Sequence, residues 1–161
     1  MSDEVIIDET SRIDQSRLII PGLAGLYRQV APLGYALLRV VLAIEFLTAG
    51  IDKVFLGGAG RIAVGNIVRM GLPAPTAWAW LVAGVEFFGA ILLGIGLWTR
   101  PVAFALAVEL AVIGFVIMLP RGVFWTSGGL EVALLMMLMA IGFVLGGGGR
   151  YSVDRLIGRE F

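Results

Sequence analysis

The sequence predicts an all-α integral membrane protein, a four-helix bundle in which neighbouring spans are antiparallel. First, 59% of the 161 residues are hydrophobic and the mean hydropathy is +0.97, which leaves too few polar side chains to cover a soluble domain. Second, the apolar residues gather in four windows, each close to the length of about 20 residues that a helix needs to cross a bilayer. Third, tryptophans stand near the ends of these windows, where aromatic rings prefer the headgroup region.

The residues before the first window are predicted to lie outside the hydrocarbon core. Residues 1–17 mix acidic and basic side chains and lack the basic start and apolar centre of a cleaved signal peptide, so we expect a solvated tail. The stretch 18–32 is apolar but is interrupted by Pro21, Gly22 and Gly25. We expect it to lie along the membrane interface, with a disordered leader as the alternative.

The membrane domain is predicted to cover residues 33–147. Its four spans run approximately over residues 33–51, 76–97, 101–119 and 129–146. Trp78 and Trp98 are twenty residues apart, which is about 30 Å along a helix and equals the thickness of the hydrocarbon core. The short connector that ends at Pro101 predicts an antiparallel hairpin of the second and third spans.

The remaining connectors and the tail complete the predicted organisation. Residues 52–75 form the longest connector and include a possible short helix over 61–70, so we expect a lid or a partner-facing element here. The glycine run 146–149 ends the last helix, and residues 148–161 are predicted to be a cytoplasmic tail. Because Lys and Arg are more numerous on the side that holds both termini, we predict that both termini are cytoplasmic.

The composition narrows the possible chemistry. Twelve basic residues balance twelve acidic ones, so nucleic acid is not an expected partner. The chain has no cysteine and no histidine, which excludes thiolate metal sites, iron–sulfur clusters and histidine-ligated haem within it. The methionines 136, 137 and 139 are interpreted as packing residues. We therefore expect no metal site and no covalent cofactor.

Ionisable side chains in the spans are the candidate functional residues, because a charge near the bilayer centre costs at least about 2.5 kcal/mol. In chain order they are Arg39, Glu45, Lys53, Glu86, Glu109 and Glu131. Helical spacing places Arg39 and Lys53 on one face with Gly50, and Glu45 on another. Antiparallel spans would place Glu45, Glu86 and Glu109 near mid-membrane, Arg39 nearer the cytoplasmic side, and Lys53 and Glu131 towards the outer side. These depths favour the pairs Arg39–Glu86 and Lys53–Glu131. The carboxylates outnumber the cations, so at least one is expected to be protonated or to contact a ligand or another subunit. A buried ion-pair network that only fixes helix register is the alternative.

Three segments carry a family resemblance. They are LLRVVLAIEFLTAGIDKVF in the first span, VEFFGAILLGIGLWTRP across the second span and its turn, and GGGGRYSVDR after the fourth. In their order and spacing they resemble the DoxX family of small four-helix bacterial membrane proteins. The motif positions of that family fall on Arg39, Gly50, Lys53, Glu86, Thr99, Arg100, Glu131, Gly149, Arg150, Ser152 and Asp154. Ala49 stands where members often have histidine, while Glu45 and Glu109 lie outside the pattern, which suggests docking against a specific partner helix.

The resemblance implies an association with membrane oxidoreductases, including a thiosulfate:quinone oxidoreductase subunit, and with complexes that handle thiol and oxidative stress. We therefore expect a membrane subunit of a larger, redox-linked complex with no independent catalytic activity. It would anchor a partner or bind a quinone-like lipid through the six candidate residues. A purely structural membrane protein and a small proton-coupled transporter are the alternatives. The expected partners are membrane lipid and other membrane-protein subunits.

Overall fold

The computed structural model describes residues 19–159, and every regular element in that range is helical. The long helices are α1 (Ala24–Phe55), α3 (Pro75–Ile95), α4 (Thr99–Val112) and α5 (Glu131–Gly146). Helix α4 continues through the π-helix η5 (Ile113–Met118) and the 3-10 turn η6 (Leu119–Arg121). The shorter elements are η3 (Pro21–Leu23), α2 (Gly58–Ile62), the π-helix η4 (Ala63–Ile67), η7 (Trp125–Ser127) and α6 (Val153–Ile157).

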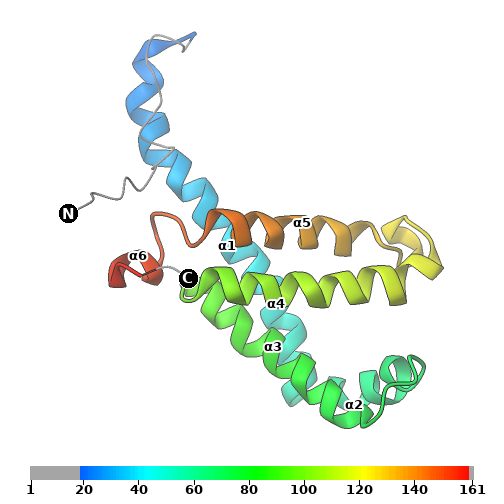
Figure 1. Cartoon of the computed structure of the whole chain (residues 1–161). Helices are drawn as coiled ribbons and strands as arrows, with labels where there is room; N and C mark the ends of the chain where they lie inside the picture. Colours follow the sequence, from blue (N-terminus) through cyan, green and yellow to red (C-terminus); the bar gives the residue numbers. More distant parts are fainter. Residues whose placement is uncertain (1–18, 160–161) are drawn as a thin grey trace.

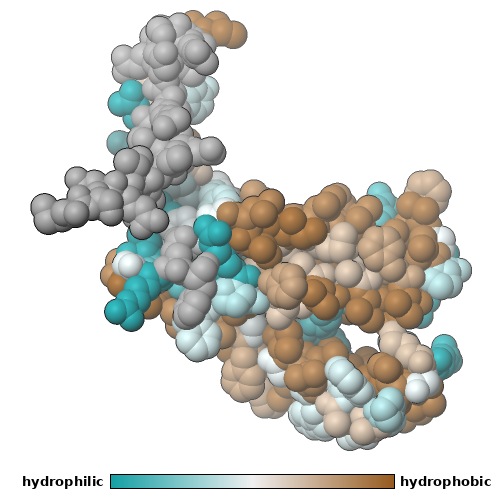
Figure 2. Space-filling model, in the orientation of Figure 1, coloured by the Kyte–Doolittle hydropathy of each residue, from teal (hydrophilic) through white to brown (hydrophobic). Residues whose placement is uncertain are grey.

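Three of these helices are long and apolar enough to cross a membrane: α1, α3, and α4 with its continuation to Arg121. Helix α5 is equally apolar in character but shorter, with 16 residues. Figure 2 shows hydrophobic residues spread over the surfaces of α4 and α5. A protein surface of this kind is suited to contact with lipid.

The observed helix ends agree with the predicted spans except at the first one. Helix α1 begins at Ala24, well before the predicted start at residue 33, and Pro32 lies inside it. Residues 24–32 are therefore the first part of α1 and not a separate segment, while the interfacial location of residues 18–32 stays a prediction. A proline removes one backbone hydrogen bond, and helices of membrane proteins tolerate this loss. The N-terminal part of α1 extends beyond the other helices (Figure 1). The predicted tail, residues 1–17, lies outside the described residues.

The long helices pack as two pairs. Helix α1 packs mainly along α3, and α4 packs mainly along α5. Helices α3 and α4 are joined by a tight turn at Gly96–Trp98 and diverge from it, so the two pairs form a V (Figure 1). Figure 2 shows an opening between the arms of this V, on the side of α2. The short helix expected within residues 61–70 is present as the end of α2 and η4.

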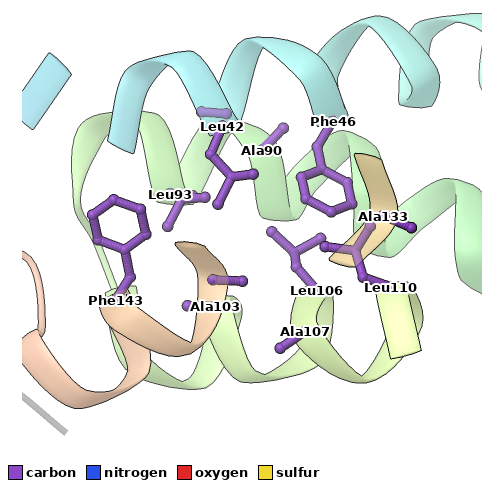
Figure 3. Packing of buried hydrophobic residues seen from close by; sticks show 12 residues of the cluster. Leu42, Phe46, Ala90, Leu93, Ala103, Leu106, Ala107, Leu110, Ala133 and Phe143 are labelled. Carbon is purple, nitrogen blue, oxygen red and sulfur yellow. The ribbon is translucent and has the colours of Figure 1, made fainter. Parts of the chain in front are cut away.

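The hydrophobic core fills the closed end of the V. Leu42 and Phe46 of α1 point toward Ala90 and Leu93 of α3 and toward Leu106 of α4 (Figure 3). Close approach of α1 and α3 depends on Gly50, because a Cβ atom there would lie 2.7 Å from the Cα atom of Phe87. Small residues at helix contacts let membrane helices approach in this way. The core thereby holds the two helix pairs together at this end of the V.

Candidate functional site

A buried cluster of charged groups lies where the two helix pairs meet. The ammonium group of Lys53, near the end of α1, forms a salt bridge with Oε2 of Glu86 in the middle of α3. The exposed fractions of the two side chains are 13% and 3%. A pair this deeply buried holds α1 against α3, because separating the charges would leave each without compensation in a medium of low dielectric constant.

Glu109 of α4 is the third member of this cluster. Its side chain interacts with that of Glu86 and lies within the electrostatic reach of Lys53. Both carboxylate oxygens of Glu109 are buried, and within residues 19–159 they receive no hydrogen bond from a donor. Two carboxylates can hydrogen-bond to each other only when one of them carries a proton. The cluster therefore offers a carboxyl group with unused hydrogen-bonding capacity beside a fixed ion pair.

Arg39 lies elsewhere and has a different role. Its side chain is 2% exposed, and its guanidinium donates to the carbonyl of Gly148 and, at 2.6 Å, to the carbonyl of Tyr151. These carbonyls belong to the segment after α5, so Arg39 binds the C-terminal end of the chain to α1. Backbone carbonyls are the acceptors that an arginine can use inside a membrane protein without a carboxylate.

Asp154 completes the attachment of the C-terminal segment. Its carboxylate accepts hydrogen bonds from the backbone N–H of Trp98 at 2.7 Å, and from the backbone N–H and hydroxyl of Thr99 at 2.9 and 2.8 Å. Trp98 has a φ of 52°, in the left-handed region that non-glycine residues rarely adopt. The carboxylate thus holds the turn between α3 and α4 in an unfavourable backbone conformation. We call residues 147–157 and these contacts the C-terminal latch.

Two candidate residues lie apart from both groups. Glu131, at the first position of α5, accepts a hydrogen bond from the backbone N–H of Trp125 at 3.1 Å and so stabilises the turn before α5. Glu45 is exposed on the outer side of α1. As predicted, it occupies a different face from Arg39 and Lys53.

The predicted pairs Arg39–Glu86 and Lys53–Glu131 were both wrong. Depth estimates placed Glu86 and Glu109 correctly at one level, because each lies about 15 Å along its helix from the shared turn. Depth estimates could not show that the side chain of Lys53 reaches Glu86. They also could not show that Arg39 would use backbone carbonyls, since no side chain marks such acceptors in a sequence.

Comparison with known proteins identifies the family of this chain. The sequence profile of the DoxX family matches residues 34–119.

The chain belongs to the DoxX family.

An uncharacterised protein of Haemophilus influenzae is 38% identical over 76% of this chain and 90% of its own length. An uncharacterised membrane protein of Mycobacterium tuberculosis is 28% identical over 87% of this chain and 91% of its own length. No solved structure gives a significant match. The DoxX chain described here is therefore an integral membrane protein with several apolar helices.

The DoxX match covers only part of the functional geometry. It includes Arg39 and the Lys53–Glu86–Glu109 cluster, but it ends before α5 and the C-terminal latch. Sequence reasoning interpreted the glycine run before the latch as a helix end and named Gly149, Ser152 and Asp154 as family motif positions, but it assigned them no structural role. A signal was present in Ser152 and Asp154, because a serine followed by an acidic residue is a common start of a helix. Ser152 does cap α6 by accepting from the N–H of Arg155 at 3.2 Å.

Proposed function

We propose that this DoxX protein is an accessory membrane subunit of a larger, redox-linked complex, and that Lys53, Glu86 and Glu109 bind the headgroup of a quinone-like lipid. The observation that carries the proposal is the pair of buried Glu109 oxygens, which lack a donor within the described residues. A hydroxyl of the reduced headgroup would supply that donor. Lys53 would donate to a carbonyl of the oxidised form while Glu86 holds its ammonium in place.

The same helices offer room for an apolar tail. A surface groove of about 440 Å³ runs between α3 and α4 and is lined by apolar residues that include Gly84, Gly89 and Trp98. Glycines flatten this part of α3, so a flexible chain would lie against the helix surface. When bound, a quinone would supply the redox chemistry, and this chain would supply the donor, the acceptor and a site closed to water.

The proposal includes a topology. Helix α5 would be a fourth span, antiparallel to α4, with both termini on the cytoplasmic side of a bacterial inner membrane. The packing of α5 along α4 and the excess of Lys and Arg on the side of the termini support this topology.

A second candidate is proton-coupled transport. It is favoured by the contact between Glu86 and Glu109, since two neighbouring carboxyl groups in a membrane can share and release one proton. Flux measurements in proteoliposomes with a pH gradient test this reading. Under the quinone reading, no solute-dependent proton flux is expected.

The quinone proposal is tested by calorimetric titration of the protein in lipid nanodiscs with a short-chain ubiquinone analogue, in its oxidised and reduced forms. Glu109→Gln removes an acceptor oxygen but keeps the shape of the side chain. We expect it to weaken binding of the reduced form about tenfold, which corresponds to the loss of one hydrogen bond.

Glu45→Gln is the matched control, because Glu45 is exposed on the outer side of α1 and does not touch the cluster. It should bind both forms like the unaltered protein. Equal binding by Glu109→Gln and the unaltered protein, or no binding by either, would contradict the proposal and favour a purely structural role for the cluster.

A further inference from the structure

The outer side of α1 carries a carboxyl group among apolar side chains. Glu45 is exposed together with Leu38, Val41 and Thr48. These residues follow each other at spacings of three and four, so they form one stripe along the helix. We call this stripe the Glu45 face.

Lipid alone is a poor environment for the Glu45 face. Glu45 lies ten residues before Phe55, the last residue of α1, so it is about 15 Å from that end of the helix. A glutamate side chain is too short to reach the interface over that distance. Ionisable groups in such places almost always face another polar group rather than lipid.

The described part of this chain supplies no partner for Glu45. The neighbouring Thr48 hydroxyl is used by its own helix, since it donates to the carbonyl of Glu45 at 2.8 Å. The basic side chains within the same stretch of α1 are also occupied. Arg39 donates to the carbonyls of Gly148 and Tyr151, and Lys53 is paired with Glu86.

A second copy of the chain does not solve this problem. Two copies inserted in the same orientation place their Glu45 side chains at the same depth, where like groups would meet. Their Arg39 and Lys53 groups are committed within each copy. Two Glu45 groups could pair only if one of them carried a proton, whereas a cation from a different protein would compensate the charge of Glu45 directly.

We infer that the Glu45 face docks a transmembrane helix of another protein, and that this helix carries a lysine or arginine at the depth of Glu45. Leu38 and Val41 pack against the apolar residues of that helix, and Glu45 receives the cationic group. This docking surface lies on a different side of α1 from Lys53, so it does not depend on a quinone-like ligand at the cluster.

The inference is tested with synthetic transmembrane helices in lipid vesicles. The peptides consist of leucine with one central residue, which is lysine, leucine or glutamate. Because the chain has no cysteine, Leu56→Cys introduces a single labelling position at an exposed site just after α1. Energy transfer between this label and a labelled peptide then reports association.

We expect the lysine peptide to associate about tenfold more strongly than the leucine peptide, which is typical of one polar contact between membrane helices. Glu45→Leu should abolish this difference. The variant is compatible with folding because leucine suits an exposed position in lipid, and its thermal stability confirms the fold.

Two results would overturn the inference. One is equal association of the lysine and leucine peptides with the unaltered protein. The other is energy transfer between two copies of the protein that is lost in Glu45→Leu, because the Glu45 face would then be a homodimer contact. Preference for the glutamate peptide would likewise contradict a cationic partner.

Discussion

Removal of Lys53 is expected to destabilise the fold strongly. Lys53→Met leaves the Glu86 carboxylate buried next to Glu109 without its cation. Breaking a buried pair from one side typically costs about 3–5 kcal/mol. The free energy of unfolding in mixed detergent micelles measures this loss.

The double variant Lys53→Met, Glu86→Met separates the ion pair from simple loss of packing. Because it leaves no buried carboxylate at position 86, it should be more stable than Lys53→Met alone. If the single and double variants were equally unstable, Lys53 would act through packing and not through its charge.

Asp154 is expected to control the turn between α3 and α4. Asp154→Ala removes the acceptor from the backbone N–H groups of Trp98 and Thr99 and from the hydroxyl of Thr99. Buried donors without an acceptor cost about 1–3 kcal/mol, so the thermal midpoint should fall. Asp154→Asn keeps one acceptor oxygen and should lose less; an equal loss in both variants would contradict this role.

Sequence reasoning identified the charged residues of the spans but not all of their partners. It predicted correctly that Glu45 lies on a separate face, and that Glu86 and Glu109 lie at one depth. It failed for Arg39, because the acceptors are carbonyls of glycine and tyrosine more than a hundred residues away along the chain. Such contacts depend on the three-dimensional path of the C-terminal segment, which no local periodicity encodes.

The contact between α1 and α3 is an element-scale feature that one glycine controls. Gly50→Ala would place a Cβ atom 2.7 Å from the Cα of Phe87, and backbone atoms cannot move aside as a side chain can. Overpacking of this kind costs about 1–3 kcal/mol. Chemical denaturation in micelles should show this loss.

Gly34→Ala is the control within the same helix. A Cβ atom at Gly34 would meet no atom within 4 Å, and alanine favours a helix over glycine by roughly 0.5–1 kcal/mol. This variant should be neutral or slightly stabilising. If both substitutions had the same effect, helix propensity and not close packing would explain the result for Gly50.

The helices themselves were largely predictable. The ends of α3, α4 with η5, and α5 lie within two residues of the predicted spans, since hydropathy and the turn residues act locally. The start of α1 was not predictable. Glycine and proline usually interrupt a helix, but α1 continues through both Gly25 and Pro32. The V formed by the two helix pairs also lay outside sequence reasoning, since it depends on where small residues meet across the core.

For the whole molecule, the C-terminal latch is expected to be essential for stability. A chain that ends after residue 147 lacks the carbonyls of Gly148 and Tyr151 that bind Arg39, and the carboxylate of Asp154. A buried arginine without these acceptors should destabilise the fold by several kcal/mol. Protease resistance in membranes and the thermal midpoint measure the effect.

Arg39→Met provides the decisive comparison for this prediction. In the full-length chain it leaves two carbonyls without a donor and should destabilise the protein. In the shortened chain it removes the buried charge and should be stabilising. Opposite signs of the change in stability are expected only if Arg39 and the latch stabilise the fold through their contacts with each other. A change of the same sign in both chains would contradict this role.

The latch also has a consequence for biosynthesis. Ribosomes make Arg39 more than a hundred residues before its acceptors at positions 148 and 151. During most of translation, α1 therefore holds an arginine whose final acceptors do not yet exist. Nascent α1 should therefore stay beside the insertion machinery or a chaperone until residues 148–151 have been made and can reach Arg39.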